Sequence, residues 1–146
     1  MSANLAQQYV GPDARLTLEG PRPDLIDMGR RFFAATGHPA TFDAEAFSAL
    51  LGRMEADPGS VLLTSRKGML GGSLAPCWCA PTWITAVEFF WWSEDGHGLR
   101  LLRRFERWAR EMGANEIRMT TLAKLPDAER AMRGYERTET AWTRII

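Results

Sequence analysis

The residues best suited to chemistry lie where an apolar segment gives way to a long helix. This junction reads Gly96-His97-Gly98 and leads into a helix predicted over residues 99–112. Glycines let a ligand approach the backbone, and the first turn of a helix offers unpaired N–H groups and a positive dipole end. This combination suits a phosphate group. A simple tight turn explains the same glycine spacing, so both readings stay open.

One carboxylate, that of Glu88, stands alone in the segment 83–92 that precedes this junction. The segment is otherwise β-branched, aromatic or small, and it predicts a buried central strand. Desolvation there raises the pKa of a carboxylate toward neutrality. The alternatives are that Glu88 faces solvent or pairs with an arginine of the following helix. Strand alternation predicts one face made of Ala86, Glu88, Phe90 and Trp92, opposite Val87, Phe89 and Trp91.

A regular succession of elements positions these residues. Apolar periodicity predicts helices over 24–36 and 43–55, a short helix over 127–133, and strands over 15–19, 60–65, 69–74, 115–122 and 138–146. The helix over 99–112 joins the strands 83–92 and 115–122, so these two run parallel if they are adjacent. The order β-α-α-β-β-β-α-β-α-β predicts one α/β (α+β) domain spanning residues 1–146, with residues 1–14 as a loose leader.

Composition narrows the class of protein. The 146 residues carry 18 basic and 18 acidic side chains, which argues against a polybasic nucleic-acid or membrane-surface binder. No signal peptide is visible, and the longest apolar run is too short to span a bilayer. Cys77 and Cys79 are predicted to be buried, reduced strand cysteines, and no metal site is expected because His38 and His97 lie far apart in sequence. We expect a cytoplasmic protein without nucleic-acid or membrane partners.

The element order, the glycine loop and the ending Gly-Tyr-Glu-Arg-Thr-Glu at 134–139 together resemble the GNAT superfamily of acyl-CoA-dependent N-acetyltransferases. The resemblance covers residues 15–146. The pyrophosphate loop of the family, Gln/Arg-x-x-Gly-x-Gly/Ala, aligns with Ser-Glu-Asp-Gly-His-Gly at 93–98, and its glycine–aromatic step matches Gly134-Tyr135. The paired tryptophans at 91 and 92 and the Gly-Tyr-x-x-Thr-Glu ending are also similar to small GNAT-like proteins of phages and prophages.

The resemblance implies a mixed central sheet, splayed between its fourth and fifth strands and flanked by helices. It implies acetyl-CoA as co-substrate and direct transfer of the acetyl group to an amine of a small molecule or protein in a ternary complex, and it is compatible with a homodimer. Glu88 occupies the position of the family's general base, which deprotonates the incoming ammonium directly or through a water. The implied cofactor-binding residues are Phe90, Trp91, Trp92, Gly96, His97, Gly98, Leu99 and Arg100.

The sequence departs from the family pattern at several positions. Ser93 replaces the first Gln or Arg of the loop, and Glu94 and Asp95 place negative charge beside the expected phosphates. Arginines at 100, 103 and 104 are available as compensation. Arg130 stands where the family commonly has a tyrosine that protonates the leaving thiolate, so water would protonate that group or it would leave unaided. The alternative function is a catalytically inactive GNAT-fold binding or assembly protein, of phage origin.

Overall fold

The computed structural model describes residues 24–122, 130–139 and 141–146. The helices and strands assigned there are α1 (Leu25–Thr36), α2 (Ala44–Ala56), β1 (Ser60–Ser65), β2 (Gly68–Cys77), β3 (Ala80–Ser93), α3 (Gly98–Glu111) and β4 (Glu116–Arg118). Within residues 24–118 they follow the predicted order. The predicted leader at 1–14 and the predicted strand at 15–19 lie outside the described residues.

The ends of the helices follow from capping side chains and glycines. Asp24 caps α1 by accepting hydrogen bonds from two backbone N–H groups of the first turn, and Asp43 caps α2 in the same way with one. Gly37 ends α1 in the left-handed conformation, with a φ of 69°. Gly113, just beyond α3, has a φ of 75°. The predicted boundaries of these three helices are therefore confirmed to within about two residues, the usual spread between assignments.

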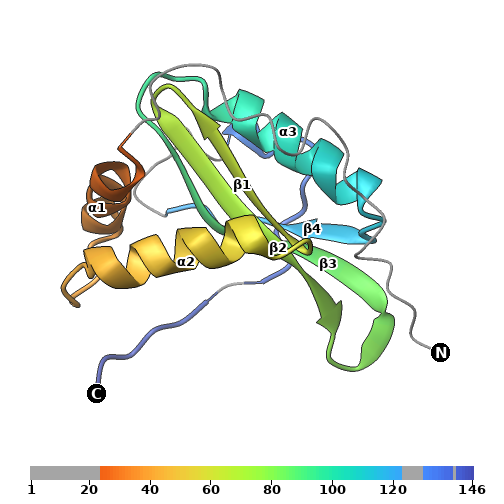
Figure 1. Cartoon of the computed structure of the whole chain (residues 1–146). Helices are drawn as coiled ribbons and strands as arrows, with labels where there is room; N and C mark the ends of the chain where they lie inside the picture. Colours follow the sequence, from red (N-terminus) through yellow and green to blue (C-terminus); the bar gives the residue numbers. More distant parts are fainter. Residues whose placement is uncertain (1–23, 123–129, 140) are drawn as a thin grey trace.

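The sheet has the order β1-β2-β3-β4 and is mixed. The pairs β1–β2 and β2–β3 are antiparallel, and β3 and β4 are parallel, as predicted for two strands joined through α3. The helices α2 and α3 cover opposite faces of the sheet (Figure 1). One apolar cluster packs α3 against one face, around Phe105 and Leu70. The other packs α1 and α2 against the opposite face, around Met28 and Phe90.

The parallel strands β3 and β4 stay together for only three residue pairs. Pairing begins at Thr85–Glu116 and ends at Val87–Arg118, whereas β3 continues to Ser93. The parting of these two strands was expected, but the predicted strand at 115–122 is shortened to Glu116–Arg118. The physical reason is that the backbone N–H of Thr120 donates to the carboxylate of Glu88 at 3.0 Å and not to the ladder.

A β-bulge in β3 changes which side chains share a face. Glu88 and Phe90 pair with consecutive residues of β2, so Phe89 is the extra residue. Ala86 packs in the cluster under α3, whereas Phe90 and its neighbour Trp92 pack in the cluster under α1 and α2. The prediction that 86, 88, 90 and 92 share one face is therefore wrong. The reason is that simple alternation assumes an uninterrupted ladder.

The glycine opposite this bulge tolerates no side chain. A Cβ atom built at Gly72 would lie 2.5 Å from the carbonyl oxygen of Val87 and 2.7 Å from the ring of Phe105. We expect Gly72→Ala to lower the free energy of unfolding by about 1–3 kcal/mol, the usual cost of overpacking a core. The matched control is Gly52→Ala in α2, where a Cβ meets nothing within 4 Å and a helical Ala is favourable. Urea denaturation measures both, and equal shifts would contradict the close approach at residue 72.

The predicted C-terminal strand over 138–146 is not formed in the described part of the chain. The described residues of 138–146 contain no strand, and their apolar side chains are exposed, with Trp142 at 93%. The neighbouring edge strand is the reason, because β4 offers only three residues for pairing. Of the predicted helix at 127–133, Arg130 and Ala131 are helical, and 127–129 lie outside the described residues. No helix within the described ranges combines the length and the apolar character needed to cross a bilayer.

The prediction that the two cysteines are buried in a strand is wrong. Cys77 is the last residue of β2 and is half-buried, and Cys79 lies in the hairpin turn and is exposed. The β2–β3 pairing ends at Cys77–Ala80, which places both cysteines at the end of the hairpin. Figure 1 shows this hairpin projecting away from the three helices. Burial was predicted from the apolar composition of the segment, but the ladder places it at the tip.

Candidate functional site

Glu88 occupies the point at which β3 and β4 part. Its side chain is 7% exposed, and its Oε2 accepts the hydrogen bond from the Thr120 N–H. Burial raises the pKa of this carboxyl group to about 7, although the bond from Thr120 opposes the shift. Both protonation states are therefore populated near neutral pH, which is the condition for accepting and releasing a proton efficiently. The raised pKa agrees with the sequence analysis.

Neither alternative role for Glu88 is realised. The side chain is buried, and within the described part of the chain no salt bridge reaches it. Three of the arginines of α3 have other partners, and Arg100 and Arg107 are exposed. Arg103 and Arg110 pair with Glu106 of their own helix, and Arg104 donates to a backbone carbonyl of β1. Glu88 is thus a buried acid without a cationic partner among the described residues, and desolvation dominates its protonation.

The two glycines of the loop serve different purposes. Gly96 has a φ of 73°, a conformation that other residues rarely adopt, and a Cβ there would meet nothing within 4 Å. Gly98 is buried, and its carbonyl oxygen accepts a hydrogen bond of 3.1 Å from the indole Nε1 of Trp91. A Cβ at residue 98 would lie 3.1 Å from Cβ of Ser93. Only Gly96 therefore leaves open space beside the backbone.

The start of α3 already holds one anion of the chain itself. Asp95 accepts hydrogen bonds of 3.0 Å from the backbone N–H of His97 and from the Ser93 hydroxyl. The bond from His97 lowers the pKa of Asp95, so this carboxylate is ionised. The N–H of Arg100 donates to the His97 carbonyl. The candidate donors that remain between residues 96 and 100 are the N–H groups of Gly96, Gly98 and Leu99.

The other acidic residue of the loop, Glu94, is directed toward α1. Its carboxylate accepts hydrogen bonds from the Arg31 guanidinium, one of them 3.2 Å long, and from the Trp92 indole at 3.0 Å. The Arg31 bonds lower the pKa of Glu94. Of the two carboxylates expected beside a phosphate, one is therefore neutralised by a cation of α1. The other, Asp95, stays at the helix start.

The predicted site residues form two groups joined by an open strand edge. Trp91 lies with the loop on the α3 side, and Phe90 and Trp92 lie on the α1–α2 side, so the two tryptophans face opposite sides as expected. His97, Leu99 and Arg100 are exposed at the start of α3. From Glu88 to Ser93 the described chain gives β3 no β4 partner. This stretch is about 17 Å long at the usual rise per residue.

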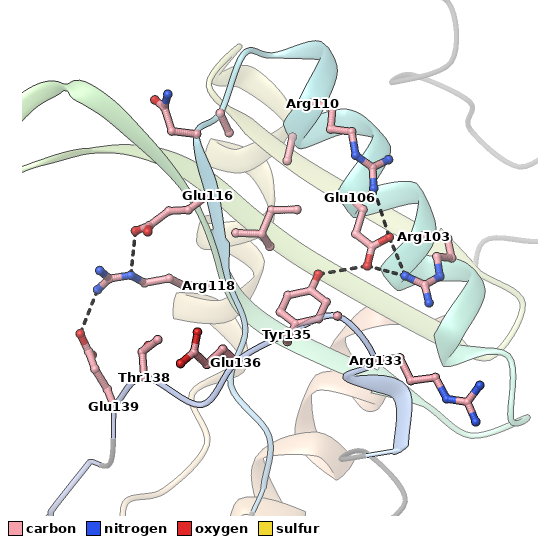
Figure 2. Close-up of a pocket in the computed structure, with 15 residues that line it drawn as sticks. Arg103, Glu106, Arg110, Glu116, Arg118, Arg133, Tyr135, Glu136, Thr138 and Glu139 are labelled. Carbon is pink, nitrogen blue, oxygen red and sulfur yellow. Dashed lines mark hydrogen bonds and ion pairs between the residues drawn. The ribbon is translucent and has the colours of Figure 1, made fainter.

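A separate cavity of about 640 Å³ lies between the second half of α3, β4 and residues 133–139 (Figure 2). It contains none of the predicted site residues. Its central group is Glu106, 5% exposed, which accepts two hydrogen bonds from Arg103 and one of 3.1 Å from the Tyr135 hydroxyl. Burial and the neighbouring Glu106 raise the pKa of Tyr135. These contacts hold the Gly134-Tyr135 segment against α3.

Glu106 was not predicted as a functional residue from the sequence. It lies among the arginines of α3, yet the structure buries it. A signal was present, because arginines three residues before it and four after it have the spacing of helical ion pairs. The backbone N–H of Thr120 was also missed, and no side-chain pattern could have revealed it.

Comparison with known proteins gives matches at the level of structure. No family model and no curated protein sequence matches the chain. A predicted acetyltransferase from Clostridium acetobutylicum, solved with acetyl-CoA, has a TM-score of 0.61 and 14% identity over 84% of this chain and 87% of its own. An aminoglycoside 6'-N-acetyltransferase from Acinetobacter haemolyticus has a TM-score of 0.56 and 13% identity over 87% of this chain and 97% of its own. Glucosamine-6-phosphate N-acetyltransferase from Arabidopsis thaliana has a TM-score of 0.56 and 8% identity over 85% of this chain and 95% of its own.

These likenesses concern the fold. Identities of 8–14% carry no residue-level information, but the alignments span most of both chains. The mixed sheet with flanking helices is that of GNAT-fold acetyltransferases, and the predicted fold class is confirmed.

Proposed function

We propose that the chain is an acetyl-CoA-dependent N-acetyltransferase that acetylates an amine of a small molecule or a protein. The observation that carries the proposal is the Glu88 carboxylate, buried where β3 and β4 part, with a pKa of about 7. In a fold shared with acetyltransferases, a buried carboxylate with this pKa supports a role as general base.

The chemistry required of the chain is removal of one proton. An amine reaches the site mainly as an ammonium ion, which has no free electron pair to attack a thioester carbonyl. The ionised Glu88 accepts that proton, directly or through a water, and the Thr120 N–H holds the carboxylate in place while it does so. The amine then attacks directly in a ternary complex, without a covalent enzyme intermediate.

The loop at 93–98 and the start of α3 fit the phosphates of acetyl-CoA in part. The N–H groups of Gly96, Gly98 and Leu99 are the candidate donors, and the exposed Arg100 supplies a positive charge. From Glu88 to Ser93, β3 has no β4 partner among the described residues, and this edge suits an extended arm. Acetyl-CoA supplies the activated acetyl group. Asp95 opposes this binding, because it occupies one of the helix-start N–H groups and carries a negative charge.

The contribution of Arg100 is testable with a variant on the same helix as control. Arg100→Glu should weaken acetyl-CoA binding by about tenfold or more, since a charge-assisted contact is replaced by repulsion. Arg107→Glu makes the same change at another exposed position of α3, seven residues further along, and should leave the affinity within about twofold. Isothermal titration calorimetry measures both. Equal affinities for the two variants would place the phosphates elsewhere.

Calorimetry with acetyl-CoA, followed by coenzyme A release with a panel of primary amines, tests the proposed function itself. Saturable binding and amine-dependent release are the expected results. Failure to bind acetyl-CoA in folded protein would favour the alternative, a catalytically inactive GNAT-fold binding or assembly protein of the kind found in phages.

A further inference from the structure

The tip of the β2–β3 hairpin brings two thiols together at the protein surface. The Sγ atoms of Cys77 and Cys79 lie 3.5 Å apart, within hydrogen-bonding distance for sulfur. Cys79 is exposed and Cys77 half-buried, and Trp78 between them is 94% exposed. The hairpin projects beyond the helices (Figure 1). Because Cys79 is exposed and Cys77 only half-buried, small molecules in solvent have access to this pair. None of these residues belongs to the proposed acetyl-transfer site.

The two thiols have unequal environments. The pKa of Cys77 is lowered, chiefly by a hydrogen bond from the Cys79 backbone N–H, with a further bond from the Cys79 thiol and a smaller effect of Arg118 on β4. The pKa of Cys79 is raised, chiefly because its thiol donates to Cys77. In a pair of this kind, one sulfur is suited to attack a disulfide as a thiolate. The neighbouring thiol is suited to displace the group that the first sulfur then carries as a mixed disulfide.

We propose that Cys77 and Cys79 form a reversible thiol–disulfide exchange site for low-molecular-weight disulfides of the glutathione type. The Cys77 thiolate attacks one sulfur of the disulfide RSSR, which forms Cys77–S–S–R and releases RS⁻. Cys79 gives its proton to RS⁻ and attacks the Cys77 sulfur, which closes the Cys77–Cys79 bond and releases a second RS⁻. Two protein thiols are oxidised, and one small disulfide is reduced to two thiols.

The hairpin tip also makes the product easy to reverse. Cysteines separated by one residue close a small ring, and strained or exposed disulfides are readily reduced. The β2–β3 ladder ends at the Cys77–Ala80 pair, so closing the ring disturbs little of the sheet. Reduction by a monothiol should therefore restore the two free thiols. The site acts as a switch between two states of one exposed turn.

Mass spectrometry after incubation with oxidised glutathione tests the proposal on the intact chain, whose only cysteines are these two. The wild-type protein should lose the mass of two hydrogens. Cys79→Ser should instead stop at one added glutathionyl group on Cys77. Both changes should disappear on addition of a monothiol. A wild-type protein that stays fully reduced, or that keeps an added glutathionyl group, would overturn the proposal.

The two single variants also test which sulfur attacks. Cys79→Ser should be modified at Cys77 about threefold or more faster than Cys77→Ser is modified at Cys79. In urea-unfolded protein the two rates should become equal, since the hairpin geometry is lost. Equal rates in the folded variants, with circular dichroism matching the wild type, would contradict the assignment of Cys77. None of these measurements depends on acetyl-CoA, so their outcome is separate from that of the proposed function.

Discussion

Glu88→Gln is expected to slow acetyl transfer by about a hundredfold at neutral pH, the lower end of a general-base contribution. Glutamine keeps the side-chain volume and an oxygen that can accept the Thr120 N–H bond. It removes only the ability to accept a proton. The affinity for acetyl-CoA should stay unchanged, so the loss appears in turnover per folded molecule. Coenzyme A release measures that turnover, with calorimetry as the check on binding.

The pH dependence separates a base from a structural residue. The wild-type rate should rise as pH passes through about 7, because Glu88 becomes ionised there. This step should be absent in Glu88→Gln. The ratio of the two rates should then shrink at higher pH, since more of the amine arrives already deprotonated. A purely structural Glu88 predicts a ratio that does not change with pH.

A carboxylate outside the site provides the control. Glu45 is exposed in the first turn of α2, and Glu45→Gln makes the same chemical change there. Its turnover should match that of the wild type at every pH. If Glu88→Gln matches the wild type as well, Glu88 is not the base, and the proposed function loses the observation that carries it.

The protonation behaviour of Glu88 was predictable, but its surroundings were not. Apolar neighbours on both sides in sequence are enough to indicate desolvation. The bulge at Phe89 depends on the opposite strand, where Gly71 and Gly72 leave room for the Phe90 ring and the Val87 carbonyl. The glycine pair weakens the strand pattern, as glycines within strands often do at bulges. Which strand bulges, and at which residue, is decided only when the two strands pair.

The elements that were predicted wrongly are those that need a partner distant in the sequence. Helices α1 and α2 are specified by local capping aspartates, Asp24 and Asp43, and both were predicted. A C-terminal strand needs an edge to pair with, and β4 is three residues long. The loop shows the same limit, since Gly98 is explained by its contact with Trp91, seven residues earlier. Spacing alone could not reveal this contact, and the backbone N–H of Gly98 stays a predicted phosphate donor.

Burial of Glu88 also predicts how stability changes with pH. The pKa of this carboxyl group is raised from 4.5 to about 7 by folding. Its stabilising contribution is therefore fully present below about pH 4.5, where the group is protonated in both the folded and unfolded states. It is lost as pH rises through about 7, because the folded state must then hold a buried charge. At about 1.4 kcal/mol per pKa unit, the loss amounts to about 3 kcal/mol.

The glutamine of Glu88→Gln cannot titrate. The free energy of unfolding of this variant, minus that of the wild type, should therefore increase by about 3 kcal/mol between pH 4.5 and 8. Urea denaturation at several pH values measures the difference between the two proteins, and contributions from all other titrating groups cancel in it. The difference requires only that Glu88 is buried, whether or not the chain acetylates anything. A difference that stays constant with pH would mean that the carboxylate titrates normally. Glu88 would then be mostly ionised at neutral pH without help from its surroundings, and the step expected in the rate profile near pH 7 would have no origin.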